Sequence, residues 1–552
     1  MTQTVAAAPE RGHRGARRHA HPALVLLLIA GAQLMVVLDG TIVNIALPSM
    51  GAYFDKDQTS MTWALNAYTL AFGGLLLLGG RSGDILGRRR MFIVGLSLFT
   101  AGSFLAGIST TFPEMLVGRV IQGIGGAIAA PTALSLIANE FDEGPERTRA
   151  FAVYAAVSGA GAALGLLLGG ILTNYFSWRW VLFVNVPIGL LLITGAFLYL
   201  HQTDRLRGRI DFVGGLISVA GMVALVYGFI HAANDGWRNG ETVGVLVASG
   251  VLLVGFVLFE AYGTAHPIMP MRIFESRSRG GAYLVMLVAG AAMFGMFYFI
   301  TFFVQGVRDY SALKTGFAFL PIALTIGVTS QIVAKLLPRT GPKPLISVGT
   351  VLLTGSLLWL SRVSTASQYA DTLLPGMIVL AVAMGCLFVP LTTVAVSKIE
   401  NTDAGLASAL LNVGQQVGGA IGLSVLATVF ATSARNFAAD HIGGVQAALG
   451  RLPGNLPQLV GAKVQAAGSN GIQKADIDKF VNGLPAGQRP AAHDFFYGPY
   501  AQLSHQIQAH ASGQAFLTGA IFGVVGIVVA LVVINVKKSD VPSEPPLEAV
   551  AA

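Results

Sequence analysis

Long apolar stretches recur along the whole chain, and they constrain its fold more than any other feature. A transmembrane helix needs about 20 mostly apolar residues. Fourteen stretches meet this requirement, near 23–48, 60–79, 91–110, 113–138, 150–172, 179–200, 211–231, 243–263, 280–304, 314–337, 344–361, 372–397, 405–432 and 514–536. The first is too long for the apolar core of a signal peptide, so we expect it to be retained. The sequence predicts an all-α integral membrane protein with fourteen transmembrane helices.

The composition agrees with this class. Only 11% of the 552 residues are charged and 54% are hydrophobic, which leaves too little charge to cover soluble domains. The single cysteine, Cys386, excludes a disulfide framework, and the histidines lack metal-ligand spacing. We therefore expect no metal and no cofactor. The net charge of +8 does not indicate nucleic-acid binding, because the basic residues are spread loop by loop and form no continuous patch.

The distribution of Lys and Arg orients the chain in its membrane. An even number of spans places both termini on the same side. Twenty-two of the 35 Lys and Arg residues lie on that side, against six in the short loops and helix ends opposite. Because short loops rich in Lys and Arg stay in the cytoplasm, we expect the tails 1–22 and 537–552 to be cytoplasmic and the protein to lie in the cytoplasmic membrane.

The spacing of the spans predicts two bundles with an insertion between them. We expect a six-helix bundle over 23–200, two linker helices with their flanking cytoplasmic loops over 201–279, and a second six-helix bundle over 280–536. Repeated halves around a midplane site are typical of transporters. The polar segment 433–513 is expected to be a long extracellular loop between the thirteenth and fourteenth helices. It either caps the outer mouth or is disordered, and we favour partial order.

Two charged residues lie deep inside predicted spans, Asp39 in the first and Arg119 in the fourth. At 1.5 Å per residue, Asp39 lies about 13 Å and Arg119 about 9 Å below the outer helix ends, with Gln122 one turn deeper. Charges inside a membrane are costly and usually functional. The two groups either form a static ion pair or exchange partners during proton transfer, and we favour proton coupling because a nearby Arg tunes a desolvated carboxyl group.

The loop after the second span carries the most specific pattern in the chain. Gly83 and Gly87 allow a tight turn and a close helix approach, and Asp84 can accept hydrogen bonds from the start of the next helix. The spacing Gly-x-x-x-Asp-x-x-Gly-Arg-Arg-Arg is similar to the signature loop of the major facilitator superfamily. The residues that match it are Gly80, Gly83, Asp84, Gly87, Arg88, Arg89 and Arg90.

Nearly all of the chain resembles a fourteen-helix drug:proton antiporter of this superfamily. The resemblance rests further on the motifs at 38–48, 119–125, 178–189 and 412–419. It implies that the loop 80–90 latches the cytoplasmic gate and that Arg119 takes part in proton transfer. It also implies an antiporter motif in the fifth helix, formed by Gly161, Gly165, Gly169 and Gly170.

One residue departs from that fifth-helix motif. Leu166 stands where the family carries a proline, so the kink that a proline gives is missing. This departure bears on how tightly transport is coupled to protons. The small-residue face still allows close packing between the two bundles.

Polar residues on otherwise apolar helices are candidates for lining a substrate cavity. The set comprises Gln33, Asn44, Tyr68, Gln122, Tyr298, Asn412, Gln415 and Gln416. Hydrogen bonding between helices is the alternative for each of them. Glu260 lies near the cytoplasmic end of its span, where we expect its side chain to reach out to the membrane surface.

The sequence thus predicts a monomeric, proton-driven exporter of amphipathic small molecules such as drugs, antibiotics and dyes, working by alternating access. One alternative is a dedicated exporter of an endogenous antibiotic, siderophore or lipid. Another is a membrane receptor whose segment 433–513 binds a partner. An enzyme is not expected, because no nucleophile–base pair, phosphate loop or paired carboxylate marks a membrane face.

Overall fold

The computed structural model describes residues 22–141, 145–201, 211–264, 267–397, 401–467, 472 and 474–536, and these contain helices and no strand. The first half comprises α1 (Pro22–Phe54), α2 (Gln58–Leu86), α3 (Arg88–Ile108), α4 (Phe112–Glu140), α5 (Pro145–Tyr175), the short α6 (Trp180–Phe183) and α7 (Asn185–Tyr199). The linker hairpin comprises α8 (Phe212–Asp235), α9 (Gly240–Leu258) and the helical turn η1 (Phe259–Gly263).

The second half follows a short helical turn, η2 (Met271–Glu275). Its long helices are α10 (Arg277–Gly306), α11 (Ala312–Thr340), α12 (Pro342–Leu360), α13 (Leu374–Val396) preceded by η3 (Tyr369–Leu373), α14 (Asn401–Leu449), and α18 (Ala501–Val528) continued by η6 (Val529–Val533). Between α14 and α18 lie α15 (Leu456–Ala467), α16 (Lys474–Gly483), α17 (Arg489–Phe495) and η5 (Phe496–Tyr500).

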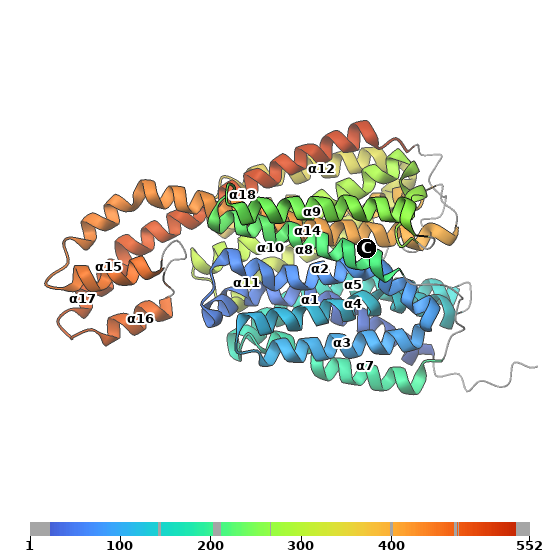
Figure 1. Ribbon diagram of the computed structural model, residues 1–552, viewed down its shortest axis with the longest axis horizontal. Helices are drawn as coiled ribbons and strands as arrows, with labels where there is room; N and C mark the ends of the chain where they lie inside the picture. The colour runs from blue at the N-terminus through green and yellow to red at the C-terminus, as the bar shows by residue number, and fades with distance from the viewer. Residues whose placement is uncertain are drawn as a thin grey trace, which may run out of the picture.

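Thirteen of the described helices are long and apolar enough to cross a membrane. The remaining crossing is α5. Its described apolar part is Ala163–Tyr175, and the helix packs against both α1 and α11. The expected fourteen-helix membrane fold, with two sets of six and two linker helices, is confirmed. Figure 1 shows the long helices lying side by side along one axis.

Local sequence explains where several of these helices begin. Asp57 accepts a hydrogen bond from the backbone N–H of Ser60 and caps α2. Thr111 and Glu114 form a reciprocal capping box at the start of α4. Gly87, with φ of 100°, ends α2 and starts α3, a backbone conformation that glycine adopts without strain.

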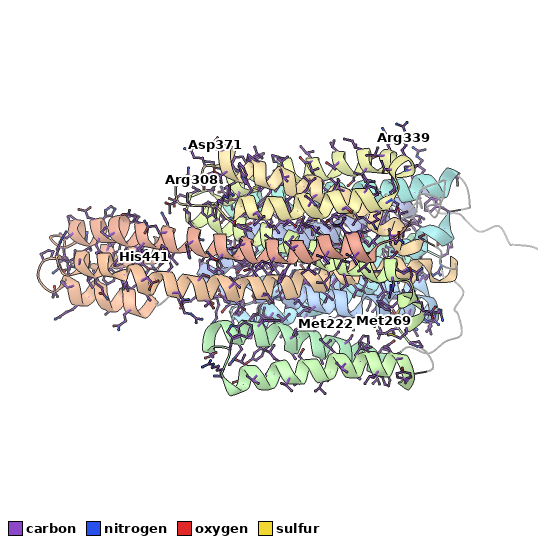
Figure 2. All side chains as sticks on the ribbon, turned by 90° about the horizontal axis from the view of Figure 1, so that it is seen from above. Met222, Met269, Arg308, Arg339, Asp371 and His441 are labelled. Carbon is purple, nitrogen blue, oxygen red and sulfur yellow. The ribbon has the colours of Figure 1, made fainter. Side chains whose placement is uncertain are left out.

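The bundle has two ends, which we name by what they carry. At the projecting end α1 meets α2, and residues 433–513 extend outward; at the terminal end α1 begins and η6 finishes. In Figure 2, Arg308 and Asp371 mark the projecting end, and Arg339 marks the terminal end.

The apolar core joins the two halves near the projecting end. One buried cluster combines Leu38–Met50, Met61 and Met115 of the first half with α10–α14 and α18 of the second. A separate cluster lies in the terminal-end part of the first half. It includes buried apolar residues between Val25 and Val36 on α1 and between Tyr68 and Leu76 on α2. The halves therefore close on one another toward the projecting end.

Residues 433–513 are here called the projection, and their described part forms a helical extension. Helices α14 and α18 continue past the bundle, and α15, α16 and α17 pack beside them (Figure 1). Their packing forms a core of its own, made of Val445, Leu456, Val460, Ile477, Val481, Leu484, Ala492, Phe495 and Phe496. The described residues of the projection are helical and extend along the axis of α14. A cap over the outer mouth stays a prediction.

One expectation is wrong, and one stays a prediction. Glu260 does not reach out to the surface: its side chain is buried, with 3% exposed, because the start of α8 and the segment before η2 cover it. The tails 1–21 and 537–552 lie outside the described residues.

Candidate functional site

A fully buried ion pair lies at the centre of the first half. Arg119 Nη1 on α4 donates to Asp39 Oδ2 on α1 at 2.6 Å, and the two side chains are 1% and 0% exposed. Helices α1 and α4 run in opposite directions, so the two depths estimated from the sequence meet at one level. The structure brings together the two charged residues that the sequence singled out.

Amide side chains occupy the other carboxylate oxygen of Asp39. Gln122 Nε2 donates to Oδ1 at 2.7 Å and Asn185 Nδ2, at the start of α7, donates to it at 3.0 Å. Both amides also donate to Ser103 Oγ on α3, which in turn donates to the carbonyl of Leu182. Both oxygens of the carboxylate thus accept from buried donors, as a charge in this setting requires.

Arg119 has partners besides Asp39. Its Nε donates to the carbonyl of Ala64 on α2 at 3.0 Å, and Nη1 also donates to Gln122 Oε1 at 2.8 Å. Its guanidinium carbon lies 4.5 Å from the ring centre of Tyr68, which adds a cation–π contact. The cation keeps three stabilising contacts that do not involve the carboxylate.

Glycines on α3 and α4 allow the close helix approach that the network needs. A Cβ added at Gly102 would lie 2.5 Å from the backbone nitrogen of Gln122, and one at Gly95 would lie 2.7 Å from that of Ala129. Only residues without a side chain fit at such distances. This approach lets the short Ser103 side chain reach across to Gln122.

Residues of the loop 80–90 hold the start of α3 against α4 and α7 by close packing and hydrogen bonds. A Cβ at Gly83 would lie 2.6 Å from the Thr132 side chain on α4, and Gly87 donates its N–H to the Gly83 carbonyl at 3.1 Å. Arg88 donates to the Ser135 carbonyl at 3.4 Å and Arg89 donates to the carbonyls of α7. Gly80 packs near Pro131, Arg90 is exposed, and the side chain of Asp84 lies outside the described residues.

The fifth-helix glycines differ from expectation in the helix they meet. Cβ atoms at Gly161, Gly165 and Gly169 would all contact α1 of the same half, so this face does not pack between the bundles. Gly170 instead faces the second half, where an added Cβ would lie 2.8 Å from the Ala312 carbonyl on α11. Leu166 is fully buried, and its carbonyl approaches Gly316 of α11.

The eight cavity candidates separate into groups. Tyr68 and Gln122 belong to the buried network, Asn44 donates to the Gly40 carbonyl within α1, and Tyr298 is buried with its hydroxyl donating to the Gln58 carbonyl. The remaining four are exposed or partly exposed, and they are Gln33, Asn412, Gln415 and Gln416. Gln33 accepts a hydrogen bond from the Tyr154 hydroxyl at 2.6 Å, and Gln416 packs against Gly73 on α2.

Polar contacts join the halves at the level of the network and on its projecting side. Asn66 Nδ2 on α2 donates to Ser424 Oγ on α14 at 3.0 Å. Gln305 Nε2 on α10 donates to the Ile45 carbonyl on α1 at 3.1 Å. These contacts and the shared apolar core make the projecting end the closed end, whereas Asn412, closer to the terminal end of α14, is exposed.

Sequence reasoning missed some functional neighbours. Ser103 is one of several small polar residues on α3 and carries no pattern of its own. Asn185 was noted as a motif residue, but nothing in the sequence linked it to Asp39. Arg279 is one of the 22 basic residues that the sequence places on the side of the termini, yet it is buried and its guanidinium donates to the carbonyls of Ala395 and Ser397 at the end of α13.

The fold and the site together define a class of protein. Two helical halves that close at one end, with a buried charge pair inside the first, are the architecture of a multi-pass membrane transporter. Within the described residues, no group of three or more His, Cys, Asp or Glu side chains gathers as a metal site.

The comparisons with known proteins identify the family. The model of the Major Facilitator Superfamily matches residues 29–423, and the chain belongs to this family. It is 43% identical to the puromycin resistance protein pur8 of Streptomyces alboniger over 75% of this chain and 83% of that protein. It is 30% identical to the tetracenomycin C resistance and export protein of Streptomyces glaucescens over 99% of this chain and 96% of that protein.

Solved structures share the fold. A bacterial homologue of the human lysosomal transporter Spinster, solved inward-facing and unoccupied, superimposes with a TM-score of 0.59. That match covers 92% of this chain and 98% of the other at 15% sequence identity, which establishes similarity of fold alone.

Proposed function

We propose that the protein is a proton-driven exporter of amphipathic small molecules across the cytoplasmic membrane. The observation that carries this proposal is the buried Asp39–Arg119 pair, in which the cation has partners of its own besides the carboxylate. The substrate class follows from the relatives, whose names record resistance to puromycin and the export of tetracenomycin C.

The proton switch works through the carboxylate of Asp39. When a proton binds there, the charge that Arg119 neutralises disappears. Arg119 then relies on the Ala64 carbonyl, Gln122 and the Tyr68 ring, so no bare cation is left in the membrane.

Alternating access uses the two ends of the bundle. We assign the terminal end to the cytoplasm, from the excess of Lys and Arg there, and the projection to the outside. The structure is closed at the projecting end, so it corresponds to the state that receives substrate from the cytoplasm, near the partly exposed Gln33, Asn412, Gln415 and Gln416. The loop 80–90 latches the cytoplasmic gate in the opposite state.

The driving force is sufficient for useful export. One proton moving inward across 100 mV supplies about 2.3 kcal/mol, which sustains a roughly 50-fold substrate gradient before any pH gradient is counted. The protein is proposed to act as a monomer, because one chain contains both halves and the complete network.

Drug accumulation in cells lacking other efflux pumps tests the export activity. Cells that produce the protein are expected to accumulate less puromycin than control cells, and a protonophore is expected to abolish the difference. Equal accumulation with and without the protein, at verified membrane levels, for puromycin, tetracenomycin C and a panel of cationic and neutral dyes would refute export of this substrate class.

A dedicated exporter of one endogenous metabolite is the second candidate. Relatives named for single antibiotics favour it. The same panel discriminates the two, because a dedicated exporter lowers the accumulation of one chemical family and leaves the others unchanged.

A further inference from the structure

The linker hairpin contains a second pair of buried ionisable groups. Asp211 opens α8 and Glu260 lies in η1 at the end of α9, so the two meet where the hairpin begins and ends. Their exposed fractions are 9% and 3%. Neither residue takes part in the Asp39 network.

Each carboxyl group uses one oxygen and leaves the other unpaired. Asp211 Oδ1 accepts from the Gly214 N–H at 2.9 Å, and Glu260 Oε2 accepts from the Met269 N–H at 2.8 Å. Asp211 Oδ2 and Glu260 Oε1 are buried and have no hydrogen-bond partner among the described residues. Two unsatisfied buried oxygens at one place are uncommon in native proteins and call for a ligand.

Both unpaired oxygens lie beside the same residue, Gly214. A Cβ added at Gly214 would lie 3.0 Å from Asp211 Oδ2 and closer still to Glu260 Oε1. Glycine at this position therefore lets both oxygens converge. Two ionised carboxylates so placed would repel one another in a poorly solvated site, whereas one shared proton converts the repulsion into a short, charge-assisted hydrogen bond.

The surroundings offer no described charge to compensate the pair. The segment before η2 contributes the backbone N–H groups of Ile268 and Met269. Helix α2 contributes the apolar side chains of Leu75 and Leu78, which pack on Gly215. No described cation forms an ion pair with either carboxyl group. A proton is therefore the ligand that the two unpaired carboxyl oxygens can bind without a further charged side chain.

We propose that Asp211 and Glu260 bind one shared proton between Oδ2 and Oε1, and that this proton fastens the start of α8 to the end of α9 and to the segment entering α10. When the proton leaves, two anions face each other, the end of α9 moves away from α8, and the Glu260–Met269 bond is lost. Figure 2 shows Met269 at the end of the hairpin away from the projection. This proposal goes beyond the export activity and does not depend on it.

A metal cation is a weaker fit to the same oxygens. Hard divalent cations take six or more oxygen ligands. The pair supplies two free oxygens, and no third acidic, His or Cys side chain joins them among the described residues.

Infrared and thermal measurements on the full-length protein in lipid nanodiscs test the proposal. At neutral pH the wild type is expected to show the C=O stretch of a protonated carboxyl group that is missing from both Glu260→Gln and Asp211→Asn. The control Glu241→Gln, at the exposed start of α9, is expected to leave that band unchanged. A wild-type spectrum in which the band is unaffected by both substitutions would overturn the proposal.

The Tm measured against pH gives an independent readout. The folded pair binds a proton that the unfolded chain releases at neutral pH, so the stability it gives is present at acidic pH and lost as the pH rises. Wild-type Tm is expected to fall toward alkaline pH, and Glu260→Gln is expected to flatten the profile because its amide donates permanently to Asp211. An unchanged profile in this variant, or a rise in wild-type Tm on adding Mg²⁺ or Ca²⁺ that both variants lose, would contradict a shared proton.

If Glu260→Gln does not fold, Asp211→Asn carries the same prediction, because either amide can donate to the remaining carboxylate. Neither readout involves transport. A failure here therefore leaves the proposed export activity untouched, and a failure of export leaves this site untouched.

Discussion

At the scale of single residues, the membrane core of the first half is organised around one carboxylate. Asp39 receives donors from α4 and α7, and the α4 residues in turn bond to α2 and α3. Removing one member of such a buried pair leaves the other charge without compensation, whereas removing both charges is far less costly.

Arg119→Met is therefore expected to lower the free energy of unfolding by about 3–5 kcal/mol, because it leaves Asp39 ionised and buried. Adding Asp39→Asn to it should recover most of that loss. Denaturation of the purified variants in detergent measures the double-mutant cycle. Equal stability of Arg119→Met and the wild type would show that Asp39 is uncharged in this state.

The sequence predicted the pair because the rise per residue of a helix gives the depth of each residue below the membrane surface. It did not predict Ser103 or the contact of Asn185 with Asp39, since depth says nothing about which face of a helix meets which neighbour. Glu260 was wrongly predicted to be exposed for a related reason. That expectation assumes that the end of its helix is exposed to solvent, whereas the start of α8 and the segment around Met269 cover Glu260.

At the scale of elements, α5 connects α1 of its own half to α11 of the other half. Its glycine face lies on α1, and Gly170 and Leu166 approach α11. The sequence predicted close packing from the spacing of the glycines. It could not name the partner helix, because a periodic stripe defines a face of one helix and not what covers it.

Two glycines on that face should respond differently to the same substitution. A Cβ at Gly165 would lie 2.8 Å from the Leu38 carbonyl and closer still to the Thr41 hydroxyl, whereas one at Gly161 meets only side-chain carbons of Leu34 and Val37 at 3.2 Å or more. Gly165→Ala is expected to cost about 1–3 kcal/mol of stability, and Gly161→Ala less, because side-chain ends can move aside.

Thermal unfolding of the two variants in matched nanodiscs measures this difference. Similar Tm values for both would mean that α5 does not lie against the backbone of α1 as described. Reversal of the order, with Gly161→Ala the less stable, would have the same meaning.

At the scale of the whole molecule, the membrane bundle and the projection have separate cores. The buried residues of the projection form their own cluster, distinct from the cluster that joins the two halves. The sequence indicated polar character for this segment and favoured partial order. It did not indicate that α14 and α18 continue outward as its stems, since helix length past the membrane depends on contacts made there.

Replacing residues 444–500 by a short Gly/Ser linker is therefore expected to preserve export and to change the Tm of the bundle little. The measurement is drug accumulation in cells together with unfolding of the purified variant. A folded, correctly inserted variant that has lost all export would contradict this prediction and would show that the projection takes part in transport.

The central claim is that substrate export and proton movement are coupled through Asp39, and proton release from inverted membrane vesicles tests it most directly. Vesicles with an acidified interior contain a dye quenched by the pH gradient, and substrate is added outside. Wild-type vesicles are expected to dequench when puromycin or another exported drug is added, while Asp39→Asn vesicles, with equally folded protein, are expected to give no response. Equal dequenching by the Asp39→Asn variant, or substrate uptake by the wild type without proton release, would contradict the account.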